Sequence, residues 1–506
     1  MPGRMEFQFS LPKSVSAPRR PDPSAPPRLL IMADFSGRGQ RETSSALADL
    51  ADRPLLRVDA DSLNAVMARL APKLRLPSSV ETGAATTAIS FAQLDDFHPD
   101  ALYRRLEIFQ ILRRARTRLL NPASFAQAVA ELNPAPAPEP TRSDPGSVGE
   151  NDAALLERLL GRSPSPAPAR PADSGTAAIN TLLKAIVQPH IVHTDPRQSA
   201  WVAAVDAAIG EQMRAILHQP SFQALEAAWR SVHDLVTNFD GDAVQVELLD
   251  VTRQELLADL RAATGDPKAM GLYTLLIDRG VRLHDGEPWS LLIGDYSFGA
   301  TTEDVALLAT LGSLAAHAGG PFLAAVAPSA LGCPSPSALA DPTLWSPLSA
   351  EEREHWRLLR TSAVAPWLGL AIPRVLLRLP YGQKTDPIEQ FAFEEMPGGR
   401  DPGAYLWGNP AFVCARLIAT SFVEHGWEGG LGDALELDDL PAHVYEDSGE
   451  RAMQPGTETL LGERALQNIL ARGFMPVLGH RQRNAVRLAR LQSLADPPAA
   501  LAGPWQ

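Results

Sequence analysis

The sequence predicts an α/β (α+β) protein in which mixed sheets are flanked by helices. Three observations support this fold class. Short apolar runs typical of buried strands alternate with helical segments in the C-terminal part of the chain. The N-terminal part combines strand patterns with a long amphipathic helix. Between the two parts lie proline-rich stretches with too few apolar residues to fold, which predicts two units joined by a linker.

Composition limits the classes of function. The chain has 506 residues, of which 45% are hydrophobic and 21% charged, as is typical of a soluble globular protein with more than one domain. Its formal charge of −13 argues against nucleic acid or an anionic membrane as the main partner. The start lacks the apolar core of a signal peptide, and the most apolar stretch is interrupted by prolines and arginines. We therefore expect a cytoplasmic protein that does not insert into membranes.

Proline-rich clusters at 133–150 and 162–175 define the expected domain boundaries. Stretches of this composition are extended linkers rather than folded segments. The sequence therefore predicts an N-terminal domain, a linker and a C-terminal domain, at 1–132, 133–175 and 176–506.

A short amphipathic helix is predicted inside the linker, at 152–160. Asn151 or Asp152 can cap its first turn, and Gly161 ends it. A lone helix this short is marginal in water, so it either docks on another protein or packs back on its own domain. Its apolar face consists of four leucines: Leu155, Leu156, Leu159 and Leu160.

The N-terminal domain begins with a strictly alternating pattern that predicts a half-buried strand. Because a proline-rich stretch follows directly, this strand is tethered rather than turned tightly into the next one. Its apolar side is formed by Met5, Phe7, Phe9 and Leu11.

Three further elements are expected in the N-terminal domain. The run 28–39 predicts a buried strand that ends in a glycine turn. Residues 53–76 predict a strand followed by a helix with an aspartate cap. A long amphipathic helix is predicted to begin near Pro99 and to end at Asn121.

The C-terminal domain opens with helices, one of which spans 222–236. Its apolar residues fall at alternating steps of three and four and so form one continuous stripe, which predicts a helix-packing seam. Glu226 and Arg230 lie one turn apart on another side, where they can pair weakly. His233 lies beside the stripe, so the region is either a piece of an active site or, as we expect, a face covered by another helix. The seam consists of Phe222, Leu225, Trp229, Val232 and Val236.

After these helices the pattern changes to strand-like runs separated by helical segments such as 303–318. This alternation predicts a sheet with helices on its faces. The expected strands are 242–249, 271–278, 289–298, 320–328 and 374–380.

Two stretches resemble known binding or catalytic motifs without completing them. Gly37 and Gly39 match the first two glycines of a dinucleotide-binding turn, but Glu42 occupies the third position. Gly294 and Ser297 are separated by two residues, whereas the elbow of a serine hydrolase needs one residue between them. Plain turns and loops explain both stretches.

Candidate metal ligands are equally incomplete. His190, His193 and Asp195 lie close together, and Glu352 and His355 have the spacing found in di-iron bundles. A di-iron site needs a second copy of that motif, which the sequence lacks. The two cysteines are far apart and in settings typical of buried thiols. We therefore expect no metal, no cofactor and no catalytic residue.

Charge is distributed unevenly along the chain. Basic residues gather at 103–120 and 479–494, and acidic residues gather at 428–450. Complementary segments of this kind suit self-association and do not indicate an enzyme.

Several motifs of the C-terminal domain together resemble one family. They are similar to the large subunit of the contractile sheath of bacterial type VI secretion systems, in the family's order and over most of 180–495. The stretches are "FQALEAAWRSVHDLV", "GDYSFGATTEDVALLATLGSLAAHAGGPFLAAVAPSALG", "WLGLAIPRVLLRLPYG" followed by "FAFEE", "YLWGNPAFVCARLIATSFVEHGW" and "TETLLGERALQNILARGFMPVLGHRQRNAVRLARLQSL".

The N-terminal domain resembles the small subunit of the same sheath. In the usual system the two subunits are separate proteins that form a tight heterodimer. Here the linker makes their association intramolecular, at a high effective concentration. The stretches that carry the resemblance are "RLLIMADFSG", "LLRVDADSLNAVMARLAPKLRL" and "FAQLDDFHPDALYRRLEIFQILRRARTRLL".

The resemblance implies a structural role without catalysis. Sheath subunits of this kind form a helical tube around an inner tube of hexameric rings, and the polymer contracts to drive the inner tube outward. Neighbours exchange strands through extended tails, which makes the strand at 5–11 the first candidate for donation; pairing within its own sheet is the alternative. The implied partners are further copies of the chain, the inner-tube protein and baseplate components.

The resemblance also implies a recycling partner. The family's large subunit presents a short N-terminal helix to an AAA+ unfoldase, and the helix at 152–160 stands at the corresponding place. Its four leucines are then the candidate docking face. Two other functions stay open at this point: a cytoplasmic hydrolase that uses the loop after "LLIGDYSFG" with a histidine, and a baseplate adaptor that does not polymerise.

Overall fold

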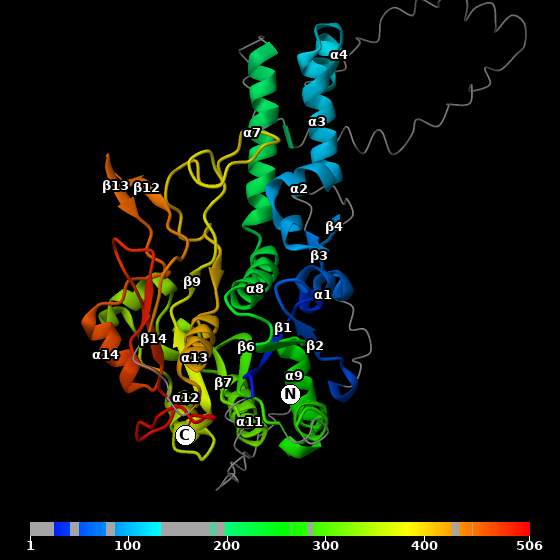
Figure 1. Ribbon diagram of the computed structural model, residues 1–506. Helices are drawn as coiled ribbons and strands as arrows, with labels where there is room; N and C mark the ends of the chain where they lie inside the picture. The colour runs from blue at the N-terminus through cyan, green and yellow to red at the C-terminus, as the bar shows by residue number, and fades with distance from the viewer. Residues whose placement is uncertain are drawn as a thin grey trace, which may run out of the picture. The chain divides into compact units, whose positions relative to one another are not determined.

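The computed structural model describes residues 25–40, 50–76, 87–132, 198–264, 266–281, 287–427, 435–447 and 449–505, together with Leu183, Ile186 and Val187. The expected strand at 5–11, the helix at 152–160 and the rest of the linker lie outside the described residues. Two compact units are present, and Figure 1 shows their elements coloured along the chain. The larger unit contains Met1–Leu76, Thr87–Ala101 and Ala215–Gln506, and the smaller one contains Pro77–Thr86 and Leu102–Arg214.

The described part of the larger unit is built around a nine-stranded sheet with the order β11-β15-β14-β8-β7-β6-β1-β5-β2. Neighbours from β14 to β5 are parallel, whereas β15, β11 and β2 run antiparallel to their neighbours. The sheet is therefore mixed, as predicted. Its strands are β1 (Arg28–Ala33), β2 (Leu56–Val58), β5 (Gln245–Asp250), β6 (Leu291–Phe298), β7 (Phe322–Val326), β8 (Leu368–Ile372), β11 (Glu436–Leu437), β14 (Met475–Gly479) and β15 (Val486–Leu488).

Three further sheets have two strands each among the described residues. They pair antiparallel and lie outside the large sheet. They join β3 (Lys73–Leu76) with β4 (Thr87–Ser90), β9 (Val375–Leu376) with β10 (Trp407–Gly408), and β12 (Val444–Asp447) with β13 (Glu450–Met453).

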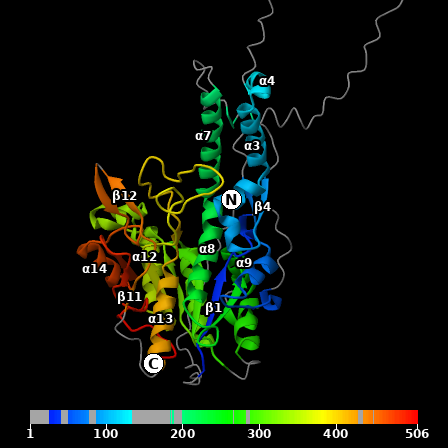
Figure 2. The same cartoon turned by 45° about the horizontal axis from the view of Figure 1, so that its top comes forward.

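Strand β1 belongs to the N-terminal segment, but both of its neighbours belong to the C-terminal segment. It pairs in parallel with β5 along its whole length and with β6 on its other side. All six of its residues are buried, which suits a strand with neighbours on both sides and helices on both faces. Figures 1 and 2 show β1 as a blue strand among green elements. The two segments therefore share one sheet, while the boundaries at 1–132, 133–175 and 176–506 stay a prediction.

Helices cover both faces of this sheet. Both α11 (Thr302–Ala318) and α13 (Ala411–His425) pack on β6, β7 and β8. Successive side chains of a strand point to opposite faces. Because every residue of β7 and β8 is buried, both faces must be covered there. One apolar core unites Leu30 and Met32 of the N-terminal segment with residues of α11.

The remaining helices of the larger unit surround this core. They are α1 (Leu63–Leu70), α8 (Pro220–Thr237), α9 (Arg253–Ala262), α10 (Gly271–Tyr273), α12 (Ala350–Arg360) and α14 (Glu463–Ala471). The smaller unit contains α3 (Glu107–Leu120), α4 (Pro122–Leu132) and most of α2 (Pro99–Arg105) and α7 (Gln198–Leu217).

The long helix expected from Pro99 to Asn121 is two helices, because α2 ends at Arg105 and α3 begins at Glu107. Within the smaller unit, two arginines of the basic segment are paired. Arg116 Nε lies 2.6 Å from a carboxylate oxygen of Asp206 on α7, and Arg118 Nη1 lies 2.7 Å from one of Glu131 on α4. Part of that basic segment is therefore paired with carboxylates of neighbouring helices.

The strand expected at 271–278 is wrong, because this run is helical. It forms α10 and then a π-helical turn, Thr274–Arg279. The carboxylate of Asp259 accepts hydrogen bonds from the backbone N–H groups of Gly271 and Leu272 at 2.9 and 3.0 Å, which satisfies donors at the start of the helix. A short buried apolar run fits either a strand or a helix, and this distant cap cannot be read from the local pattern.

Candidate functional site: two ion clusters and an arginine-lined cavity

Helix α8 carries the predicted seam. The side chain of Gln219 caps its start by accepting a hydrogen bond from the Phe222 N–H at 3.1 Å. All five seam residues are buried, with exposures of 0 to 4%. Trp229 Nε1–H donates to the carbonyl oxygen of Phe35, directly beyond β1, at 3.1 Å. The seam therefore packs against the N-terminal segment, and His233 beside it is exposed.

A buried group of charges lies on another side of α8. We call Glu226, Arg230, Arg378 and Glu395 the signature cluster. Glu226 is 0% exposed and Glu395 is 1% exposed. Arg378 lies between these carboxylates, with Nε 2.9 Å from Glu226 and Nη1 2.8 Å from Glu395. Arg230 Nε approaches Glu226 at 2.7 Å.

The surroundings of Glu395 keep it ionised. Burial by itself would raise its pKa, but the charge of Arg378, the nearby side chain of His218 at 3.4 Å, and hydrogen bonds from Arg378 and the Tyr381 N–H lower the pKa to about 2. The Tyr381 N–H donates to Glu395 at 2.7 Å. The Arg378 guanidinium also lies over the ring of Tyr381, 4.3 Å from its centroid. The cluster is thus a satisfied network of buried charges.

The signature cluster is where three of the family-like motifs meet. Glu226 and Arg230 belong to "FQALEAAWRSVHDLV", Arg378 to "RVLLRLPYG" and Glu395 to "FAFEE". A motif of the N-terminal segment contacts the residues just before "FAFEE", because the Asp100 carboxylate accepts hydrogen bonds from the N–H groups of residues 389 and 390 at 3.1 and 3.0 Å. The weak helical pair expected from the sequence is one edge of this larger network.

A second group of charges joins the N-terminal segment to the C-terminal one. We call Arg38, Arg53, Asp250 and Glu255 the junction cluster. Arg53 Nη2 lies 2.6 Å from Glu255, Arg38 Nη2 lies 2.8 Å from it, and Arg38 also pairs with Asp250. Burial opposes ionisation of Glu255, but the hydrogen bonds from Arg53 and Arg38 lower its pKa to about 2. Glu255 is positioned by its capping box with Thr252 at the start of α9.

The glycine turn after β1 positions this junction. Gly37 has a φ of +66°, which favours glycine, and the Asp34 carboxylate accepts the N–H groups of Arg38 and Gly39 at 2.9 and 2.8 Å. The turn therefore places Arg38 against Asp250, in agreement with the plain turn expected from the sequence.

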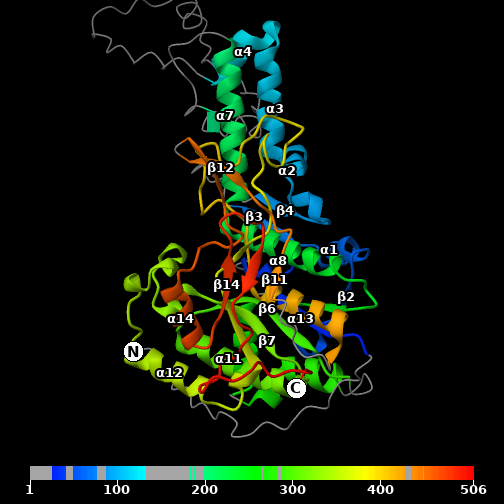
Figure 3. The same cartoon turned by 60° about the vertical axis from the view of Figure 1, so that its left-hand side comes forward.

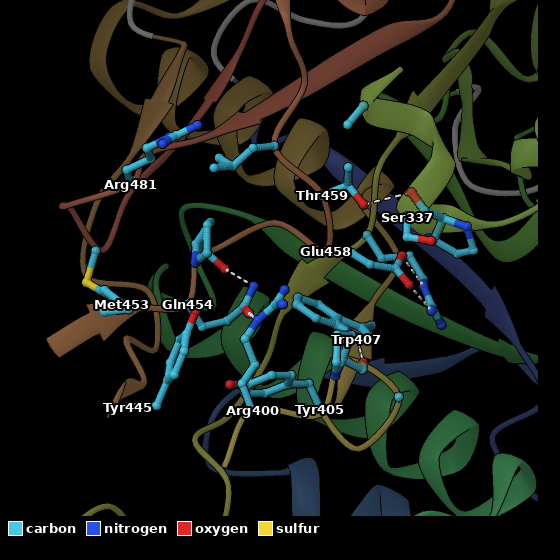
Figure 4. A pocket seen from close by; sticks show the side chains of 18 of the residues that line it. Ser337, Arg400, Tyr405, Trp407, Tyr445, Met453, Gln454, Glu458, Thr459 and Arg481 are labelled. Carbon is cyan, nitrogen blue, oxygen red and sulfur yellow. Dashed lines mark hydrogen bonds and ion pairs between the residues drawn. The ribbon is translucent and has the colours of Figure 1, made fainter. Parts of the chain in front are cut away.

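A cavity of about 1280 Å³ lies between β10, the β12–β13 hairpin and the loop around Arg400. Figure 4 shows its basic and aromatic lining. Arg374 is paired with Glu458 at 2.6 Å, and Arg400 donates to Gln454 at 2.6 Å. Its other arginines and its aromatic residues are Arg451, Arg481, Tyr405, Trp407 and Tyr445. Such a lining favours anionic groups.

Matches to two family models identify the family of this chain. The family model described as "EvpB/VC_A0108, tail sheath N-terminal domain" matches residues 199–495, and the one described as "Type VI secretion system, VipA, VC_A0107 or Hcp2" matches residues 22–133. The chain belongs to the sheath proteins of type VI secretion systems. It is a structural subunit of a contractile sheath, with both sheath-subunit domains in one polypeptide.

Two proteins of Pseudomonas aeruginosa are similar to it. The type VI secretion system sheath protein TssC1 is 34% identical over 364 residues, which cover 70% of this chain and 73% of the relative. The sheath protein TssB1 is 32% identical over 94 residues, 18% of this chain and 52% of the relative, so that match spans about half of TssB1. The family self-assembles, and neither comparison points to a hydrolase.

The incomplete motifs of this sheath protein have structural explanations. Ser297 lies inside β6 rather than at a strand-to-helix turn, so it is not a hydrolase elbow. The carboxylate of Glu352 accepts the Ser349 N–H at 2.8 Å in the capping box of α12. His190, His193 and Asp195 lie outside the described residues.

Two kinds of feature are absent from the described part of the sheath protein. No three His, Cys, Asp or Glu side chains of that part are grouped so as to hold a metal ion. None of its helices is long and apolar enough to cross a membrane.

Proposed function

We propose that this chain polymerises around an inner tube of hexameric rings and contracts to drive that tube outward, without catalysis and in the cytoplasm. The proposal includes baseplate components at the end of the tube. The observation that supports it most is the shared sheet, in which β1 of the N-terminal segment lies between β5 and β6 of the C-terminal one. The two sheath-subunit domains of one chain therefore form a single repeating unit. Identical units that bind each other through two different surfaces generate helical tubes.

Electron microscopy of the purified chain, with and without the inner-tube ring protein, tests this function. Tubes or cogwheel-like rings are the expected result. A monodisperse monomer under both conditions contradicts the proposal and favours the baseplate adaptor, and a monomer that hydrolyses an ester favours the hydrolase.

For the helix at 152–160 we propose docking on an AAA+ unfoldase that recycles contracted sheaths. The proposal is supported by the four leucines of this helix and by the position of the helix just before the C-terminal domain at 176–506. The double substitution Leu155→Asp and Leu159→Asp should abolish unfoldase binding and leave polymerisation intact. Arg158→Asp on the same helix is the control, and unchanged binding by the double variant rules the assignment out.

For the strand at 5–11 we propose donation to a neighbouring copy. Its support is the alternating pattern and the proline-rich tether that follows it. Phe7→Asp should then prevent polymerisation while the melting temperature of the monomer stays unchanged, with Gln8→Asp as the control on the polar side. A lower melting temperature of the monomer indicates instead that the strand pairs within its own sheet.

A further inference from the structure

A smaller positively charged cavity lies beside α12. Its volume is about 350 Å³, and Asp496 is the acidic residue among its lining residues. Trp356 and Phe474 contribute apolar walls, with ring centroids 5.5 Å apart. We call its four guanidinium groups the arginine face: Arg353, Arg357, Arg360 and Arg472.

Two carboxylates face the four guanidinium groups of the arginine face: Glu354 lies 2.6 Å from Arg357 Nη2, and Asp496 lies 3.8 Å from Arg360 Nη1. The positive charges therefore outnumber the negative ones paired with them. Burial lowers the pKa of Arg360, although Asp496 lies 3.8 Å away. Burial and the charge of Arg360 lower the pKa of Arg472. The indole N–H of Trp356, a residue only 6% exposed, has no acceptor among the described residues. These groups favour a carboxylate placed at the cavity.

The composition around the cavity favours a protein ligand over a small anion. Leu358 on α12 is 43% exposed, and Leu344 is 56% exposed. Leu344 adjoins Trp345, whose ring centroid lies 5.6 Å from the Arg472 guanidinium carbon. Arginine and aromatic side chains together with exposed apolar ones are typical of protein interfaces.

The β12–β13 hairpin has the complementary chemistry. Its tip carries Glu446 and Glu450, which are exposed and have no ion-pair partner among the described residues. Val444 at its base is 55% exposed. Figures 1 and 3 show the hairpin and α12 toward opposite ends of the larger unit, so one copy cannot join its own two surfaces.

We propose that the arginine face of one copy binds the β12–β13 hairpin of a second copy. The carboxylates of Glu446 and Glu450 pair with the guanidinium groups, and Val444 covers exposed apolar surface. Two different surfaces meet in this contact, so it is heterologous and repeats without closing on itself. The contact rests on the proposed function, for which it supplies one of the interfaces of the polymer.

Charge reversal of the full-length chain tests this pairing. One variant combines Arg353→Glu with Arg357→Glu, a second combines Glu446→Arg with Glu450→Arg, and a third carries all four changes. All four side chains are exposed, so folding should be unaffected and is checked by thermal unfolding. Polymer is measured by sedimentation and electron microscopy. The matched control is Arg69→Glu with Arg75→Glu, two exposed arginines far from α12 in sequence.

The two double variants should raise the critical concentration for polymerisation by about tenfold or more, because like charges face each other across the contact. The fourfold variant should restore it toward the wild-type value, and the control should leave it unchanged. Wild-type polymerisation by either double variant overturns the contact, and so does failure of the fourfold variant to recover. If a variant unfolds, Arg353→Gln with Arg357→Gln must raise the critical concentration instead, or the contact is wrong. If the wild type itself forms no polymer, the proposed sheath function is wrong. This outcome is distinct from one in which the wild type polymerises and only the proposed contact is wrong.

Discussion

Strand β1 and the β12–β13 hairpin are opposite in their surroundings. Leu29 to Met32 of β1 are 0% exposed, and the strand has a parallel neighbour on each side. The hairpin pairs only with itself among the described residues, and Val444 on it is 55% exposed. The join between the two sheath-subunit segments is therefore buried within one chain, whereas the hairpin is exposed.

The signature cluster and the arginine face also differ in how far their charged side chains are buried and paired. The signature cluster balances its charges inside the fold, and Glu226 is 0% exposed. In the arginine face, Arg353 and Arg357 are exposed and Arg360 and Arg472 are partly buried, at a cavity with one acidic lining residue. We expect substitutions in the first kind of region to change folding stability, and those in the second to change assembly.

The largest expected effect is on β1. Ile31→Asp places a carboxylate at a fully buried position in the middle of the sheet, at a cost of more than about 5 kcal/mol. The variant should be insoluble or unfolded, as measured by circular dichroism and denaturant unfolding. Ile31→Val, which removes one methyl group, should cost about 1 kcal/mol. A soluble Ile31→Asp chain with wild-type unfolding would show that β1 is not an interior strand.

The next largest effect is expected in the signature cluster. Arg378→Met leaves Glu226 and Glu395 buried without their shared partner, which should cost about 3–5 kcal/mol in the free energy of unfolding. The control is Arg374→Met, because Arg374 is 49% exposed and its pair with Glu458 should be worth about 1 kcal/mol or less. Equal losses in the two variants would contradict the assignment of the cluster as a buried network.

Much of this buried framework follows from the sequence, and the rest depends on long-range pairing. The apolar run at β1 and the seam of α8 have local patterns, so both elements are predictable. The insertion of β1 between β5 and β6 joins residues more than two hundred positions apart, and no local pattern encodes it. For the same reason the sequence predicts only a weak pair between Glu226 and Arg230, one helical turn apart. Arg378 and Glu395 come close to them only in the folded chain. The helix at 271–278 escapes prediction because its cap, Asp259, is distant in sequence.

Acid should weaken both ion clusters. The pKa values of Glu395 and Glu255 are lowered from 4.5 to about 2 in the folded chain. Their stabilising effect is therefore complete above pH 4.5 and is lost as the pH falls from there through about 2. For the fully buried Glu395 the loss is on the order of 3 kcal/mol. The melting temperature of the wild type should fall over this range, and Glu395→Gln should show a smaller fall. A Glu395→Gln chain with the wild-type pH profile would exclude this carboxylate as a source of the acid sensitivity.

The smallest effect on stability is expected at the hairpin. Val444→Thr changes a side chain that is 55% exposed, so the free energy of unfolding should stay within about 0.5 kcal/mol of the wild type. The matched control is Val423→Thr, because Val423 on α13 is 50% exposed and lies outside the proposed contact. If the hairpin meets the arginine face of a second copy, only Val444→Thr raises the critical concentration for polymerisation. If sedimentation gives the same critical concentration for the two variants, Val444 takes no part in assembly. The hairpin would then differ from β1 in burial but not in its role in the polymer.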